Sequence, residues 1–141
     1  MILPTEFEQA KIRELLASMT SSVRLVFFYQ SFLCETCPQA RQILTELSGL
    51  SERLTFEEYN LQLDRDKVKE FGVDKVPAVV VAGTRGDGLC FYGIPSGYEF
   101  SSIIDAILLE SSGDSGLSTN SRTVLANVTV PTNIQVFVAP T

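Results

Sequence analysis

The sequence predicts a single α/β domain in which a mixed central sheet is flanked by helices, and three observations predict it. Apolar runs of strand length alternate with segments whose apolar residues recur at helical spacing. The first two strand-like runs are joined through a helix, which favours a parallel pair, whereas a glycine-rich turn joins the last two as an antiparallel pair. With 141 residues, 45% of them hydrophobic, the chain can bury one core.

The first half of the chain is expected to run helix, strand, helix, strand, helix. Thr5 and Glu8 fit a capping box, and apolar residues follow them at helical spacing. The strand after this helix is almost continuously apolar, as expected for a strand covered on both faces. The expected elements are a helix that ends near residues 20–22, a strand over Val23–Tyr29, a helix after Cys34 closed by Gly49, a strand over Leu54–Asn60, and a short helix over about Asp64–Phe71.

The second half begins with a strand over Val76–Ala82, with Pro77 at its entrance, where a proline removes no hydrogen bond from the sheet. A turn and an antiparallel strand over Leu89–Gly93 follow, and then a helix bearing Ile103, Ile104, Ile107 and Leu108.

Composition changes after this helix. Residues 111–116 are rich in Ser and Gly and indicate a linker, a weak helix reaches about Ala126, and Ile134–Val138 alternates as a strand does. We therefore divide the chain into a unit over residues 1–112 and a segment over 113–141 that holds a linker, a short helix and a strand. A strand behind a linker cannot bury itself, so we expect it to join the preceding sheet or another chain.

Charge and composition exclude several classes of function. The net charge is −6, which makes nucleic acid and anionic membranes poor partners. The N-terminus lacks a basic region followed by an apolar one, and no apolar run approaches the roughly 20 residues that span a bilayer, so we expect a cytoplasmic protein. The chain has no histidine, which removes Cys-His nucleophiles, Ser-His-Asp triads and most zinc sites.

Two cysteines with two residues between them, Cys34 and Cys37, stand between the first strand and a helix. The unpaired N–H groups at a helix start favour a thiolate over a thiol, whereas the carboxylate of Glu35 opposes it. A C-x-x-C in this setting indicates a dithiol redox site. A zinc site is the alternative, but it needs about four ligands, and Cys90 is the only other cysteine. We expect Cys90 to pack in the core.

Four stretches carry a resemblance to a known family. Strand, C-x-x-C, helix and a Val-Pro pair opening an antiparallel pair are similar to the thioredoxin superfamily. More narrowly, the chain resembles the N-terminal unit of the protein disulfide oxidoreductases, which are glutaredoxin-like proteins with two fused thioredoxin-fold units. The stretches that match are Leu25–Gln30, Cys34–Cys37, Phe71–Ala78 and Phe91–Phe100.

The resemblance implies a thioredoxin-like fold with an extra N-terminal helix and an extra C-terminal strand. Residues 134–141 resemble the first strand of the family's second unit, just before that unit's own C-x-x-C. It also implies roles for three residues: Cys34 attacks a substrate disulfide, Cys37 resolves the mixed disulfide, and Pro77 is cis and faces the cysteines.

The remaining substrate-binding candidates surround these residues. The resemblance implies that Val76 offers its backbone to an extended substrate segment, as in strand addition. Tyr29 stands where thioredoxins often have an aromatic residue beside the site, and Glu35 and Thr36 lie between the cysteines. Lys75 and Arg41 are the only nearby candidate cations, from which no glutathione pocket can be argued.

Two functions are weighed for the chain. The first is a thiol–disulfide oxidoreductase that acts on protein disulfides, without a cofactor of its own, and is re-reduced by a flavoprotein disulfide reductase or by small thiols. The alternative is a redox-weak docking or dimerisation module of the same fold, which the unpaired last strand favours. For that strand we expect a homodimer joined at sheet edges through Ile134–Val138.

Overall fold

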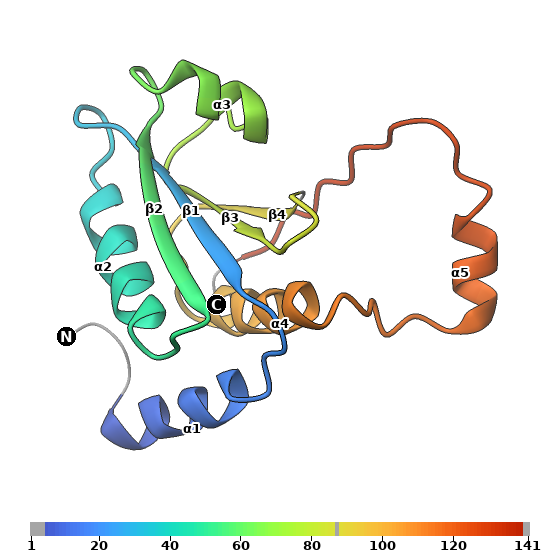
Figure 1. The fold of residues 1–141 in the computed structure, drawn as a ribbon. Coiled ribbons are helices and arrows are strands. Elements are labelled where there is room, and N and C mark those ends of the chain that lie inside the picture. The colour runs from blue at the N-terminus through green and yellow to red at the C-terminus, as the bar shows by residue number, and fades with distance from the viewer. Residues whose placement is uncertain (1–4, 87, 140–141) are drawn as a thin grey trace.

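The computed structural model describes residues 5–86 and 88–139. Figure 1 shows the order of helices and strands, which matches the order expected from the sequence through the fourth helix. No helix among the described residues is long and apolar enough to cross a bilayer. The elements are α1 (Glu6–Leu16), β1 (Val23–Tyr29), α2 (Cys37–Ser48), β2 (Leu54–Asn60), α3 (Arg65–Phe71), β3 (Ala78–Ala82), β4 (Gly88–Tyr92), α4 (Tyr98–Ser112) and α5 (Thr119–Leu125).

The four strands form one mixed sheet in the order β2-β1-β3-β4. β1 runs parallel to β2, with Val23 opposite Leu54, because the connection between them passes through α2. β3 runs antiparallel to β1, with Ala78 opposite Phe28, and β4 returns antiparallel to β3. The expected mixed α/β fold with an N-terminal helix is therefore confirmed.

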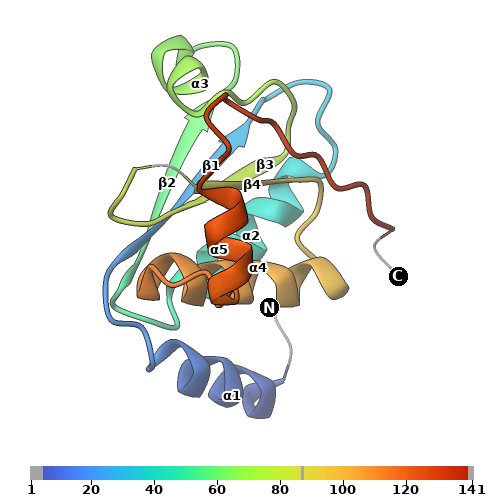
Figure 2. The same ribbon diagram turned by 90° about the vertical axis from the view of Figure 1, so that its right-hand side faces the viewer.

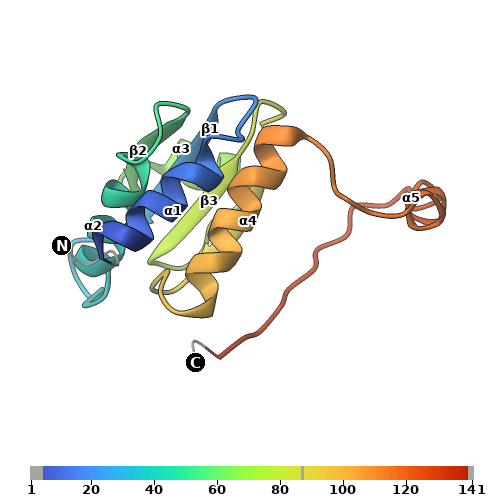
Figure 3. The same ribbon diagram turned by 90° about the horizontal axis from the view of Figure 1, so that it is seen from below.

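Helices cover the sheet unequally. Figure 3, seen from below, shows α1, α2 and α4 side by side over one face, whereas α3 covers part of the other. Successive β1 side chains point to opposite faces, so Phe27 enters the three-helix layer and Phe28 packs under α3. Both rings are fully buried, and each stabilises the fold by about 1.5–3 kcal/mol through the apolar surface it removes from water.

α1 ends earlier than the sequence predicts. Its start is as expected, with the Thr5 backbone N–H donating to the Glu8 carboxylate at 2.9 Å, but its last helical residue is Leu16. Ser111, buried at the end of α4, explains the early end. Its hydroxyl accepts from the backbone N–H groups of Thr20 and Ser21 at 2.9 and 3.1 Å. Because Ser111 of α4 holds residues 20 and 21, the connection from α1 turns directly toward β1.

The C-terminal segment contains α5 but not the strand expected over Ile134–Val138, which was wrong. Figure 1 shows α5 standing away from the sheet, and Figure 2 shows the chain arching back from it. Residues 129–139 make no backbone hydrogen bond to another element among the residues that the structure describes. A strand exists only when its backbone is paired. This segment has the alternating side chains but no pairing partner, and Ile134 is 81% exposed.

Candidate active site

The candidate site lies at the end of the two central strands, where β1 ends and β3 begins. The loop with the two cysteines follows Tyr29, the last residue of β1. Pro77 immediately precedes Ala78, which pairs with Phe28 at the end of β1. Because β3 is antiparallel to β1, the start of β3 lies beside the end of β1. The cysteine loop and the proline are therefore at the same end of the sheet.

Cys34 and Cys37 are in disulfide contact, with their Cα atoms 5.4 Å apart. Cys37 is the first residue of α2 and is buried, at 4% exposure, whereas Cys34 is half-buried in the preceding turn. The helix expected after Cys34 starts at Cys37, with Thr36 at the N-cap position. The two sulfurs can form and break one bond, and Cys34 is the more exposed residue.

α2 holds the pair in place by packing into the three-helix layer. Pro38 is the second residue of the helix, where a missing N–H leaves no hydrogen bond unmade. The residues that bury the rest of the helix are those expected from its spacing: Ala40, Ile43, Leu44 and Leu47.

The Val76–Pro77 peptide bond is cis, as the family resemblance implies. The carbonyl of Pro77 accepts a hydrogen bond from the Gly93 N–H at 2.9 Å. Val76 is half-buried, and its own backbone N–H and carbonyl have no hydrogen-bond partner among the described residues. A free backbone edge of this kind can receive an extended chain.

The other three candidates lie around the cysteines. Tyr29 is half-buried, with its ring 6.2 Å from that of Phe27 and the Arg41 guanidinium 4.6 Å from its centre. Glu35 and Thr36 are exposed between the cysteines. All three lie at the end of β1 or in the loop that follows it, and of the three only Tyr29 packs against the core.

Both nearby cations already have acidic partners. Arg41 Nε lies 2.7 Å from a Glu58 carboxylate oxygen, and Lys75 Nζ lies 3.0 Å from Asp74. The ion pair with Lys75 lowers the pKa of the Asp74 carboxyl below its ordinary value. An anionic ligand such as glutathione would have to compete with these carboxylates.

The structure adds an exposed apolar rim that the sequence analysis did not identify: Phe32, Leu33 and Leu63, whose side chains are 79%, 98% and 80% exposed. Leu33 has a left-handed backbone, with φ of 59°, which is rare for a branched residue. Large apolar residues in a loop without strand or helix spacing were the available signal. Phe32 and Leu33 directly precede Cys34 in the chain.

Two hydrogen bonds hold the loop that carries Leu63 near the end of β1. The Leu61 N–H donates to the Tyr29 carbonyl at 2.8 Å, which ties the loop after β2 to the end of β1. The side-chain oxygen of the buried Asn60 accepts from the backbone N–H of Leu63 at 3.1 Å.

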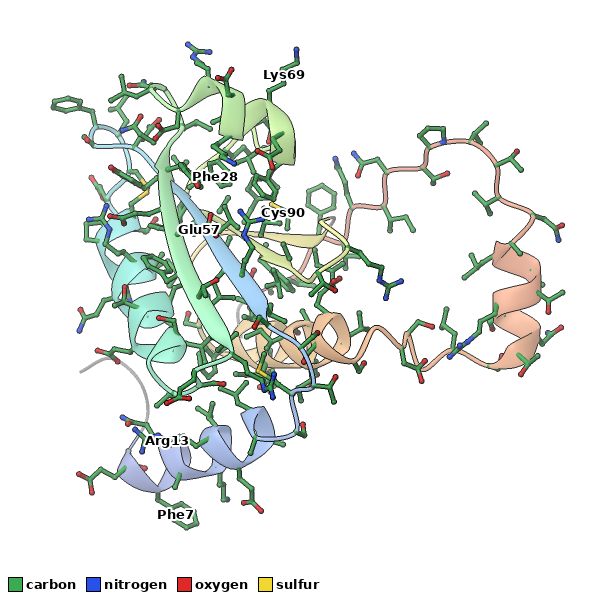
Figure 4. All side chains as sticks on the ribbon, in the orientation of Figure 1. Phe7, Arg13, Phe28, Glu57, Lys69 and Cys90 are labelled. Atoms are coloured by element: carbon green, nitrogen blue, oxygen red, sulfur yellow. A yellow bond between two sulfur atoms is a disulfide. The ribbon has the colours of Figure 1, made fainter. Side chains whose placement is uncertain are left out.

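Cys90 is exposed, so the expectation that it packs in the core was wrong. It lies opposite Val80 on the edge strand β4, on the sheet face that carries α3 (Figure 4). α3 has only seven residues and leaves this part of the face open. Partial burial still raises the pKa of the Cys90 thiol above its ordinary value.

Comparison with known proteins places this geometry in a family context. Residues 26–85 match the glutaredoxin family model. The structure is similar to a protein disulfide oxidoreductase from Aeropyrum pernix, with 28% identity and a TM-score of 0.80, covering 90% of this chain and 56% of that one. A search of curated proteins found no match.

A second similar structure is that of the alkylhydroperoxide reductase protein AhpF from Enterococcus faecalis. A mutant of AhpF has 26% identity and a TM-score of 0.79, over 89% of this chain and 61% of that one. The isolated N-terminal domain of AhpF gives 26% and 0.78, over 88% and 61%. The chain thus spans less than two thirds of the length of each of these three structures.

The matched segment, residues 26–85, contains the second half of β1, both cysteines, α2 and the cis-proline. These findings support thiol–disulfide exchange as the chemistry of the pair. The chain therefore has a thioredoxin-like fold with a glutaredoxin-like segment over residues 26–85, and Cys34 and Cys37 are the C-x-x-C pair of that segment.

Proposed function

We propose that the chain is a thiol–disulfide oxidoreductase that exchanges disulfides with protein substrates through Cys34 and Cys37. One observation carries the proposal: a C-x-x-C pair in disulfide contact lies at the same end of the sheet as a cis-proline. The residue before that proline, Val76, has a backbone N–H and carbonyl without a hydrogen-bond partner among the described residues. The match of residues 26–85 to the glutaredoxin model supports it.

The reaction proceeds by two exchanges of sulfur partners. The Cys34 thiolate attacks one sulfur of the substrate disulfide, and the other substrate sulfur leaves as a thiolate that takes a proton from water. The Cys37 thiolate then attacks the Cys34 sulfur, which forms the Cys34–Cys37 disulfide and releases the second substrate thiol. The substrate gains two electrons and the pair loses two. A flavoprotein disulfide reductase or a small thiol returns them.

Substrate binding follows from the surroundings of the pair. The free N–H and carbonyl of Val76 pair with an extended segment of the substrate, next to Pro77. Tyr29, Glu35 and Thr36 form the near wall. The apolar rim of Phe32, Leu33 and Leu63 fits substrates whose disulfide is flanked by apolar residues, as in partly unfolded proteins.

The rest of the proposal concerns the setting of the site. We place the protein in the cytoplasm, where glutathione and thioredoxin systems keep thiols reduced. Residues 1–112 form the working unit, and residues 113–141 form an appended segment.

A second candidate function is docking or dimerisation, and the appended segment favours it. Ile134 and Val136 are 81% and 79% exposed although they belong to a run that alternates as strand residues do. A partner strand that pairs with this segment would bury them. Two copies of the chain joined at sheet edges through Ile134–Val138 would each provide that partner strand for the other.

Insulin reduction tests the proposed function against this alternative. With dithiothreitol as reductant, the wild-type protein is expected to accelerate the precipitation of insulin chains, and Cys34→Ser is expected to fall to the uncatalysed rate. Cys90→Ser is the matched control, because Cys90 is a cysteine on β4 outside the C-x-x-C pair, and it is expected to keep activity well above the uncatalysed rate. Equal rates for wild type and Cys34→Ser would remove the oxidoreductase proposal.

A further inference from the structure

We infer that Tyr92 is a positioning residue for substrate binding, because it holds the segment Asp74–Pro77 so that the free backbone of Val76 faces an incoming chain. The inference rests on the proposed function, since it assigns a role within the same site. Tyr92 is the last residue of β4 and lies outside the cysteine loop.

Two contacts of the Tyr92 side chain reach the start of this segment. Its hydroxyl accepts a hydrogen bond from the Asp74 backbone N–H at 3.4 Å. The Lys75 ammonium lies 5.0 Å from the centre of its ring, within the range of a cation–π contact. The side chain therefore contacts two consecutive residues just before Val76.

The backbone at Tyr92 fixes the other end of the segment. Tyr92 lies opposite Ala78 in the β3–β4 pair, and the N–H of the next residue, Gly93, donates to the Pro77 carbonyl at 2.9 Å. Asp74, Lys75 and Pro77 are thus all held from the end of β4. Val76 lies between them, and its backbone N–H and carbonyl have no hydrogen-bond partner among the described residues.

The state of the Tyr92 hydroxyl suits this role. Burial raises its pKa to about 12, so it keeps its proton at neutral and moderately alkaline pH. Its interaction with the Asp74 carboxyl contributes, after the Lys75 ion pair, to the lowered pKa of that carboxyl. The contacts with Asp74 and Lys75 therefore persist across the pH range in which thiol–disulfide exchange is measured.

The alternative is that Tyr92 only fills space at the end of an edge strand. Its residue exposure of 38% argues against a simple core role. The two roles differ in what a substitution changes. A space-filling residue affects every substrate equally, whereas a positioning residue affects only substrates that bind through a peptide backbone.

The test compares two disulfides in the full chain. The first is a disulfide-linked peptide with extended flanks, and the second is bis(2-hydroxyethyl) disulfide, which has no peptide backbone. Tyr92→Phe is expected to raise KM for the peptide about 3-fold, and Tyr92→Leu about 10-fold, with kcat little changed. Rates with the small disulfide are expected to stay at the wild-type level. Leu89→Ala, at the far end of β4, is the matched control and is expected to change neither.

Three outcomes overturn the inference in distinguishable ways. If both Tyr92 variants lose activity equally with the two disulfides, Tyr92 is only structural. If neither variant changes KM for the peptide, Tyr92 does not position the segment. If the wild-type protein exchanges with neither disulfide, the proposed function itself fails, and this inference fails with it.

Discussion

Cys34 and Cys37 differ in exposure although only two residues separate them. The helix starts at Cys37 and draws that residue into the three-helix layer, whereas Cys34 stays in the turn outside. An incoming disulfide therefore meets Cys34 first. The sequence supported this order of the two cysteines, because a strand before and a helix after a C-x-x-C leave few other arrangements.

Alkylation rates test this difference. After reduction, Cys34 is expected to react with iodoacetamide at least about 10-fold faster than Cys37, because a thiolate must be both formed and reachable to react. In the oxidised protein only Cys90 is expected to react. Mass spectrometry of peptides taken at successive times measures all three. Faster labelling of Cys37 than of Cys34 would reverse the assigned order.

Other residues of the site could not have been assigned from the sequence. Phe32 and Leu33 are apolar, and nothing in the local pattern says that a loop leaves them exposed beside Cys34. Cys90 was expected in the core because its neighbours are apolar, but which part of a sheet face a short helix covers depends on tertiary packing.

At the scale of helices and strands, the sequence predicted most of the fold. β1 and β2 begin and end where their apolar patterns predicted, because a strand's pattern and its pairing have the same period. The end of α1 was not predictable, because it depends on Ser111, about 90 residues further along the chain. The link between α4 and the start of β1 is a tertiary feature with no local signal.

Removal of the Ser111 hydroxyl tests that link. Ser111→Ala is expected to lower the free energy of unfolding by about 1–3 kcal/mol, since partly buried N–H groups of Thr20 and Ser21 lose their acceptor. Ser112→Ala is the matched control, because the neighbouring serine is exposed, and it is expected to change stability by less than about 0.5 kcal/mol. Urea denaturation followed by circular dichroism measures both, and equal effects would contradict the assignment.

The ion pair that joins β1 to β2 is expected to contribute a pH-dependent part of the stability. Arg24 Nε and Nη2 donate to the two carboxylate oxygens of Glu57 at 2.6 and 2.9 Å, across the strand pair. Figure 4 shows Glu57 over this part of the sheet. The hydrogen bond from Arg24 holds the pKa of the Glu57 carboxyl below its ordinary value of 4.5. The stabilisation is therefore complete above pH 4.5 and is lost as the pH falls through the lowered folded pKa.

Glu57→Gln is expected to remove this pH dependence. Because both side chains are about one third exposed, the contribution at neutral pH is about 0.5–1 kcal/mol. The difference between wild type and Glu57→Gln in urea midpoint is expected to be largest near neutral pH and to shrink below pH 4.5. A difference that stays constant with pH would show that the ion pair does not contribute.

At the scale of the whole molecule, the described sheet ends in β2 and β4, and residues 129–139 make no backbone hydrogen bond to another described element. The alternating side chains of this segment predicted a strand, and the structure has none there. Pairing requires a second backbone, which the local sequence does not specify. The same argument motivates the proposed homodimer.

Sedimentation measures whether two copies associate through this segment. The wild-type chain is expected to pass from monomer to dimer as its concentration rises, because pairing would bury Ile134, Val136 and Val138. Val136→Lys is expected to remain monomeric, whereas Thr132→Lys, before the alternating run, is expected to dimerise normally. A wild-type chain that stays monomeric at high concentration would rule out the homodimer.

Trapping of the mixed disulfide tests the central claim most directly. In Cys37→Ser the first exchange can occur but the resolving step cannot, so a disulfide-containing protein substrate should stay attached to Cys34 in equal amounts with the chain. Mass spectrometry locates the linkage. A stable adduct at Cys34, absent from Cys34→Ser, is the result that the account predicts. An adduct at Cys90 alone, or no adduct, would contradict it.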